Sequence, residues 1–153
     1  MAVKGLTSAL KWIPNGLRHL GSDGVLRVVD SGTFQVTDYV RLSQTQILNF
    51  INLLPLGVRP DPAQFNNVDG TTVSAAQAQF PPPEIYASIQ ESYAKSKAAV
   101  GLGDTSKVAP KPEAVEVEKR DCSTEVCRYS SDCPSACIWC QQVTGGYGFC
   151  LGF

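Results

Sequence analysis

The distribution of cysteine constrains this chain more than any other feature of its sequence. All six cysteines lie in the last 32 of its 153 residues, and the 121 residues before them contain none. They follow a Lys119-Arg120 pair and stand at Cys122, Cys127, Cys133, Cys137, Cys140 and Cys150. This asymmetry predicts two parts: a cysteine-free leader, and a disulfide-stapled peptide over residues 121–153 that is cut from it.

The cysteine-rich peptide is too small to fold without covalent cross-links. Six of the 33 residues from Asp121 to Phe153 are cysteine, a proportion typical of a disulfide scaffold. A chain of this size buries too little apolar surface to offset its conformational entropy, and each disulfide contributes roughly 2–4 kcal/mol. An even number of closely spaced cysteines also implies an oxidising compartment, so we expect a secreted, extracellular protein.

Charge and hydropathy exclude several kinds of partner. Residues 121–153 contain three acidic side chains and one basic side chain, which gives a formal charge of about −2. Surfaces that bind nucleic acid or anionic membranes are rich in Lys and Arg, so we expect neither partner. The chain has no run of about 18 apolar residues that would predict a transmembrane helix. Its N-terminus also lacks the apolar segment of a convincing signal peptide, which conflicts with secretion.

The first 22 residues are basic and contain no acid. Five apolar residues in this segment follow a 4-3-4-3 spacing that predicts one face of a helix: Leu6, Leu10, Ile13, Leu17 and Leu20. Pro14 interrupts the pattern, because its ring opposes a helix interior. Three interpretations remain open, namely a mitochondrial presequence, an interfacial helix and an ordinary surface helix.

The rest of the leader predicts a hairpin and two helices. Val25–Val29 and Thr33–Leu42 are rich in β-branched and aromatic residues, which favours two strands joined by a turn. Ser43 begins a capping box with Gln46 for a helix that ends at Leu54. Proline-rich residues 55–83 read as a loop. A second helix is expected over Glu84–Val100, ended by Gly101 and Gly103, so the leader is either poorly structured or a small α+β piece.

The segment before the cysteines resembles the pro-segment of secreted fungal peptides. Residues 109–120 begin Ala-Pro, carry acidic residues and end in Lys119-Arg120. The resemblance implies cleavage after Arg120 by a kexin-type processing protease. An ordinary solvated basic pair is the alternative interpretation. In such peptides an apolar signal segment precedes the pro-segment, whereas the residues before Ala109 are polar here. Residues 1–108 are therefore either a genuine leader or a mis-joined upstream segment.

The cysteine spacing leaves three interpretations to weigh. Loops of 4, 5, 3, 2 and 9 residues separate the cysteines, and six cysteines allow fifteen pairings. Cys137-Ile-Trp-Cys140 matches a redox CxxC or one half of a zinc site, but no βαβ pattern and no second CxxC accompany it. We therefore predict a disulfide framework with no metal and no cofactor. In its last loop, Gln141–Thr144 and Tyr147–Leu151 are expected to be strands joined by Gly145-Gly146.

These loop lengths and the run Asp132-Cys-Pro-Ser-Ala-Cys-Ile-Trp-Cys140 resemble the inhibitor cystine knot, or knottin. Within the knottins the sequence is most similar to a fungal avirulence elicitor peptide and to the plant metallocarboxypeptidase inhibitors. The resemblance implies a small disulfide-rich fold: a cystine-knot peptide with a short antiparallel β-hairpin at its C-terminus, preceded by the leader. It also implies the pairs Cys122–Cys137, Cys127–Cys140 and Cys133–Cys150.

A cluster of apolar residues near the C-terminus predicts a protein-binding surface. A peptide with little interior exposes such side chains, and we expect this surface to contain Trp139, Tyr147, Phe149, Leu151, Gly152 and Phe153. The alternative is that Trp139 and Phe149 form a small core over the disulfides.

The sequence thus predicts a secreted peptide that binds an extracellular protein, a host receptor or a protease, in the manner of a fungal effector or elicitor. We do not expect an enzyme, because no nucleophile–base pair or metal cluster is present. The main alternative is a metallocarboxypeptidase inhibitor acting through Leu151-Gly152-Phe153. An antimicrobial peptide and an intracellular protein acting through residues 1–108 are further alternatives.

Overall fold

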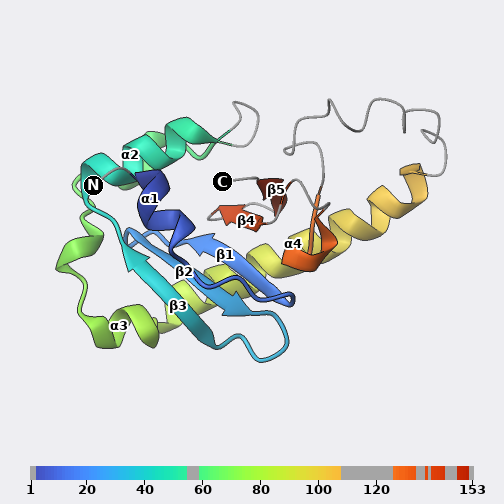
Figure 1. Ribbon diagram of the computed structural model, residues 1–153, viewed down its shortest axis with the longest axis horizontal. Helices are drawn as coiled ribbons and strands as arrows, with labels where there is room; N and C mark the ends of the chain where they lie inside the picture. The colour runs from blue at the N-terminus through green and yellow to red at the C-terminus, as the bar shows by residue number, and fades with distance from the viewer. Residues whose placement is uncertain are drawn as a thin grey trace.

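A five-stranded sheet forms the centre of the molecule and takes its strands from both ends of the sequence. The computed structural model describes residues 3–54, 59–107, 126–133, 137, 139–143 and 148–151. In these residues the strand order is β3-β2-β1-β4-β5 (Figure 1). The strands are β1 (Gly16–Leu20), β2 (Val25–Asp30), β3 (Val36–Arg41), β4 (Trp139–Val143) and β5 (Phe149–Leu151).

The central strand β1 joins the two parts of the chain. It is antiparallel to β2 and parallel to β4, with Arg18 opposite Gln141 and Leu20 opposite Val143. All five residues of β1 are buried, as expected for a strand that is covered on both faces. The cysteine-rich segment therefore adds its hairpin directly to the sheet formed by the leader.

The prediction of one N-terminal helical face is wrong beyond its first turns. Helix α1 covers only Val3–Ser8, and the chain continues as strand β1 after Pro14. Leu17 and Leu20 stand three residues apart in this strand, so they point to opposite faces of the sheet. Because β1 is buried on both faces, it accepts apolar residues at any spacing. A helix-like spacing of leucines is therefore compatible with a strand here, and the prediction of a helix was wrong.

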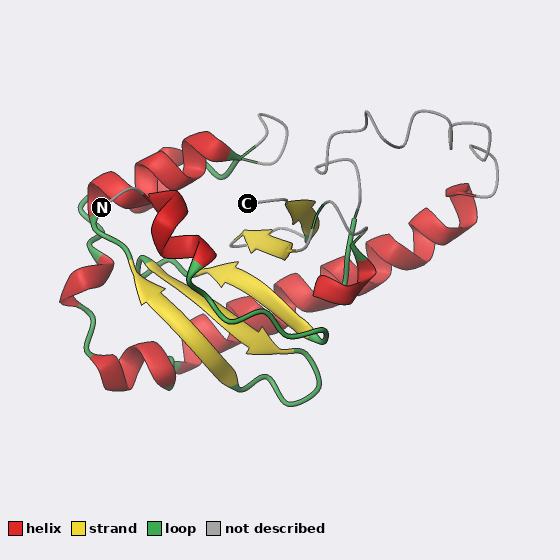
Figure 2. Cartoon of the chain, viewed as in Figure 1, coloured by secondary structure: helices red, strands yellow, loops and turns green. Residues whose placement is uncertain are grey.

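Helices cover both faces of the sheet (Figure 2). On one face, α1 and α2 (Gln44–Leu53) contribute to a cluster that includes Leu10, Leu20, Leu26, Val28, Ile47, Phe50 and Ile51. On the other face, the long helix α4 (Pro83–Lys107) contributes to a cluster of Leu17, Val29, Val36, Ile85 and Ile89. No helix in the described part of the chain combines the length and apolar character needed to cross a membrane.

Two predicted elements of the leader are confirmed. Strands β2 and β3 form an antiparallel hairpin, and the Asp30 carboxylate accepts a hydrogen bond of 2.7 Å from the Gly32 N–H in its turn. Ser43 caps α2 through a reciprocal capping box, in which Ser43 Oγ accepts from Gln46 N–H at 3.2 Å and Gln46 Oε1 accepts from Ser43 N–H at 2.9 Å. The part of the chain before the cysteines is thus an α+β unit.

Two other expectations need correction. The expected loop over residues 55–83 contains the short helices η2 (Pro62–Phe65), η3 (Gly70–Thr72) and α3 (Ala75–Gln79). Asp61, Asp69 and Ser74 begin them by accepting backbone hydrogen bonds, a local signal that the proline content obscured. Helix α4 also continues through Gly101 and Gly103, because glycine keeps its N–H and costs only about 1 kcal/mol in a helix.

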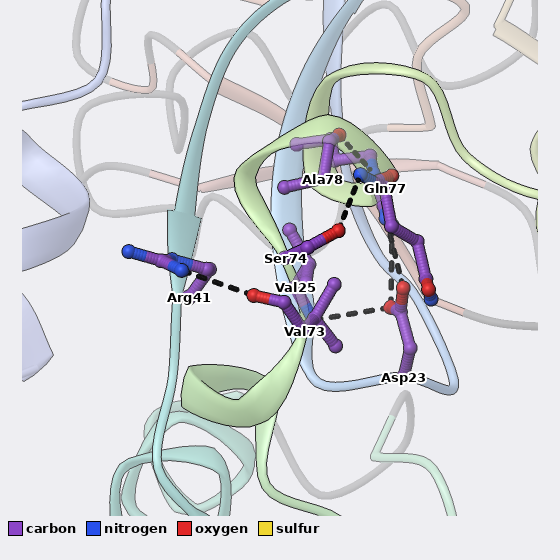
Figure 3. A network of polar contacts seen from close by, with 8 residues as sticks. Asp23, Val25, Arg41, Val73, Ser74, Gln77 and Ala78 are labelled. Carbon is purple, nitrogen blue, oxygen red and sulfur yellow. Dashed lines mark hydrogen bonds and ion pairs between the residues drawn. The ribbon is translucent and has the colours of Figure 1, made fainter.

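A buried arginine fixes α3 to the sheet. Arg27 of β2 is 0% exposed, and its Nε donates a hydrogen bond of 2.8 Å to the Ala78 carbonyl. Its guanidinium also forms an ion pair of 2.8 Å with Asp23. Figure 3 shows Asp23, Gln77 and Ala78 grouped at this contact. The arginine charge is therefore buried with its hydrogen bonds satisfied by a carboxylate and by carbonyl groups at the end of α3.

Candidate functional site

The cysteine-rich segment is held by disulfides that close within it. Cys127 is bonded to Cys140 and Cys133 to Cys150, across 13 and 17 residues of sequence. These are two of the three pairs that the knottin resemblance implied. Cys137 is also disulfide-bonded, and Cys122, the partner implied for it, lies outside the described residues. The segment is therefore a disulfide-rich region, and its knotted arrangement stays a prediction.

The pairing also bears on the metal and redox interpretations. The sulfur atoms of Cys127, Cys133 and Cys150 lie within 4.8 Å of one another, a spacing that would suit a metal ion. Each of the three is bonded in a disulfide, so none is a thiolate ligand in this structure. Cys140 is bonded to Cys127 rather than to Cys137, so the CxxC pair does not form the disulfide of a redox motif.

The predicted C-terminal hairpin is present. Strands β4 and β5 are antiparallel, with Trp139 opposite Leu151, Cys140 opposite Cys150 and Gln141 opposite Phe149. Strand β4 begins at Trp139, two residues earlier than predicted, and the Gly145-Gly146 turn lies outside the described residues. Because side chains alternate along a strand, the two cysteines point to one face and the apolar residues to the other.

The apolar face of this hairpin is buried in the intact chain. Trp139, Phe149 and Leu151 are 2%, 1% and 5% exposed and belong to the same cluster as Leu20 and Phe50. The expectation that they are exposed is therefore wrong here. They do not form a small core over the disulfides either, since the cysteines form a separate cluster. The pairing of β4 with β1 causes this burial, because it extends the apolar face of the leader's sheet onto the hairpin.

Several predicted site residues lie outside the described part of the chain. They are Lys119, Arg120, Cys122, Tyr147, Gly152 and Phe153. Their roles stay predictions, and so does the role of the buried hairpin residues in binding.

A buried cation lies against the hairpin. Arg18 of β1 is 0% exposed, and its guanidinium carbon is 4.8 Å from the centroid of the Trp139 ring and 6.0 Å from that of Phe50. Such cation–π contacts are strongest where water is excluded. Arg18 Nε also donates a hydrogen bond of 3.0 Å to Gln141 Oε1. Burial lowers the pKa of Arg18 to about 9, so the side chain keeps its charge at neutral pH.

Helix α4 makes a second set of polar contacts with the hairpin. Ser96 Oγ accepts a hydrogen bond of 3.0 Å from Gln142 Nε2 and another from the Gly148 N–H, and it donates to the Ser92 carbonyl at 2.9 Å. The hydroxyl therefore serves three groups at a buried position, where each lost partner would be costly. Helix α4 thus contacts the leader's strands through its first turns and the hairpin through its middle.

Sequence reasoning did not identify Arg18, Ser92 or Ser96 as contact residues. The serines follow Ile85 and Ile89 at a 4-3-4 spacing, so the apolar face of the predicted helix continues as hydroxyl groups. That change from apolar to hydroxyl side chains on one face was a signal that could have revealed a polar contact. Arg18 has no comparable local signal, because its partners are distant in the sequence.

The chain's one histidine is also buried in β1. His19 is 0% exposed, and neither ring nitrogen has a hydrogen-bond partner among the described residues. Burial lowers the pKa of His19 to about 3; the charge of Arg27 also lowers it, and Asp23 opposes the change. A neutral imidazole without access to solvent cannot exchange protons with an external substrate.

Comparison of the chain with protein-family models, with curated proteins and with solved structures found no match. The functional assignment therefore depends on the chemistry of the cysteine-rich segment itself.

Proposed function

We propose that this chain is the precursor of a secreted cystine-knot peptide, residues 121–153, that binds an extracellular protein. A kexin-type protease would release the peptide after Lys119-Arg120, and its target would be a host receptor or protease, as for fungal effectors and elicitors. The observation that supports this most is the closure of Cys127–Cys140 and Cys133–Cys150 inside the segment. Since no cysteine precedes residue 122, a cut after Arg120 leaves no covalent link between the two products.

The hairpin offers the chemistry that protein binding requires. Trp139, Phe149 and Leu151 lie on one of its faces, and large aromatic side chains dominate the energetics of most protein interfaces. A peptide separated from the sheet would have no partner for this face. An apolar face on a peptide held rigid by disulfides is suited to a protein partner, because little entropy is lost on binding.

The intact mass of the secreted material, with and without reduction, tests this proposal. We expect a species that begins at Asp121 and is about 6 Da lighter than its reduced form, because each of three disulfides removes two hydrogen atoms. A result in which all of the protein is full-length and carries free thiols would contradict the proposal.

Removal of residues 152 and 153 separates this function from that of a carboxypeptidase inhibitor. An inhibitor that inserts its tail would lose its effect on carboxypeptidase A, whereas a peptide that binds through Trp139 would keep its target. The deletion spares Leu151, which is 5% exposed and belongs to the apolar cluster. A parallel Trp139→Ala variant is expected to show the opposite pattern.

A further inference from the structure

The face proposed for binding is covered by the first part of the same chain. Strand β1 pairs with β4 along the hairpin, and Arg18, Leu20 and Phe50 pack against the apolar side chains that a target would need. On the other face, Ser96 of α4 binds Gln142 and Gly148. In the described residues, the hairpin is therefore enclosed from both faces of the sheet.

We propose that residues 3–107, which we call the cover, hold the peptide noncovalently after cleavage and keep its Trp139 face masked. Cleavage alone would then produce an inactive two-chain complex rather than a free peptide. This inference rests on the proposed function for the cut, and it adds the regulation of the same binding face.

The contacts that support the complex do not depend on the connecting segment. They comprise a parallel strand pairing, the Arg18 hydrogen bond to Gln141, the Ser96 hydrogen bonds and a shared apolar cluster. The Ser131 N–H also donates to the Pro14 carbonyl at 2.9 Å. All of these link residues before position 108 to residues after position 125, so all survive a cut between these positions.

Separation would be unfavourable for both products. The cover would expose Leu20 and Phe50 and would leave the β1 edge with unpaired backbone groups, while Arg18 would lose Gln141 as its acceptor. The peptide would expose Trp139 and Phe149. Release therefore requires a second event, in which the cover is degraded or a target competes for the face.

A cut introduced into the folded full-length chain tests this inference. Lys119 and Arg120 are replaced by the recognition sequence of a site-specific protease, so the result does not depend on the natural processing enzyme. The oxidised chain is cut to completion, as verified by mass under denaturing conditions, and is then analysed by size exclusion. We expect both products to elute together at the volume of the intact chain. Separate elution of the two products would overturn the inference.

A second readout uses Trp139 emission in a Trp12→Phe background, because the chain contains only two tryptophans. We expect the emission of the cut sample to match that of the intact chain. A red shift on cutting would contradict the inference that the cover stays bound and masks Trp139.

Ser96→Ala should raise the dissociation constant of the cut complex about tenfold, because two buried donors lose their acceptor. Ser74→Ala is the matched control: Ser74 Oγ caps α3, and we expect a change below about threefold. Equal effects of the two variants would also contradict the inference.

The outcomes separate the two proposals. If the cut products part while the secreted material begins at Asp121, the cover is wrong and the precursor stands. If the products stay together while the secreted protein is uncut, the proposal of a processed precursor is wrong. The noncovalent contact between the cover and the hairpin would then be supported without a role in peptide release.

Discussion

At the scale of single residues, Arg18 shows how closely the two parts of the chain depend on each other. Arg18 belongs to the leader, while its contacts Trp139 and Gln141 belong to the cysteine-rich hairpin. Gln141 lies 123 residues from Arg18 in the sequence. A buried charge is costly unless its surroundings compensate for it, and here the aromatic rings of Trp139 and Phe50 and the amide oxygen of Gln141 contribute to that compensation. At this contact, each part of the chain therefore depends on side chains that the other part supplies.

We expect Arg18→Met to lower the free energy of unfolding by about 1–3 kcal/mol. The substitution keeps apolar volume but leaves the buried Gln141 Oε1 without the donor at 3.0 Å. Urea unfolding followed by fluorescence measures the change. Lys97→Met is the control: Lys97 is an exposed side chain of α4, and we expect its replacement to change stability by no more than about 0.5 kcal/mol. Equal losses would show that the contacts of Arg18 contribute nothing specific.

His19 should make stability depend on pH. Its pKa in the folded chain is about 3, below the ordinary value of 6.5, so the unfolded state binds a proton first as the pH falls. The stabilising contribution is complete above pH 6.5 and is lost as the pH drops toward 3. Between pH 7 and pH 5 we expect a loss of about 2 kcal/mol. In His19→Leu this loss should disappear, and urea unfolding at both pH values measures it. An unchanged slope in the variant would contradict the assignment.

At the scale of elements, the turn between β1 and β2 is fixed by a close backbone approach. Gly24 has a φ of +86°, and a Cβ at this position would lie 2.7 Å from the Gly70 nitrogen. The Gly24 carbonyl accepts from Leu42 N–H at 3.1 Å, and Gly70 N–H donates to the Leu42 carbonyl at 2.7 Å. The glycines thus let η3 pack directly on the turn that leads into the hairpin of the leader.

Gly24→Ala should therefore destabilise the chain by about 2 kcal/mol, because both its backbone conformation and its surroundings oppose a side chain. Thermal unfolding measures the effect. Gly5→Ala in α1 is the control, since a Cβ there meets nothing within 4 Å. We expect it to be neutral or stabilising by up to about 1 kcal/mol. A neutral Gly24→Ala would mean that the turn relaxes without cost.

The elements that the sequence predicts well are those with local signals. The capping box of Ser43 and Gln46 marks α2, and the β2–β3 hairpin joins strands that are adjacent in sequence. Strand β1 was mistaken for a helix because burial on both faces removes the period of two that identifies a strand. Its pairing with β4 leaves no local trace, because the contact crosses most of the chain.

For the whole molecule, the shared sheet predicts a single cooperative unit. Replacing Cys127 and Cys140 together by alanine should lower the free energy of unfolding by about 2–4 kcal/mol.

Because the hairpin shares its apolar cluster with the leader, the two parts should unfold together. We expect Trp139 emission, measured in the Trp12→Phe background, and far-ultraviolet circular dichroism to report coincident transitions. A separate, earlier fluorescence transition would show that the hairpin unfolds independently of the leader's sheet.

The candidate site was predictable in part at this scale. The cysteine spacing identified the disulfide-rich segment and its hairpin, and the resemblance gave the pairs Cys127–Cys140 and Cys133–Cys150. It did not reveal that Trp139 and Phe149 are buried, because that depends on β1. A peptide considered alone has no partner for such residues, whereas the full chain supplies one.

The position of β4 in the sheet also sets the order of events during synthesis. Strand β1 leaves the ribosome early, yet its neighbour β4 is made more than 100 residues later. At about 5–20 residues per second, one side of β1 waits roughly 5–25 s for its partner. During this interval the edge of β1 is an open template for other chains. Stalled or truncated chains of this protein should therefore be more prone to aggregate than completed ones, and they would be natural clients for chaperones that bind exposed strands.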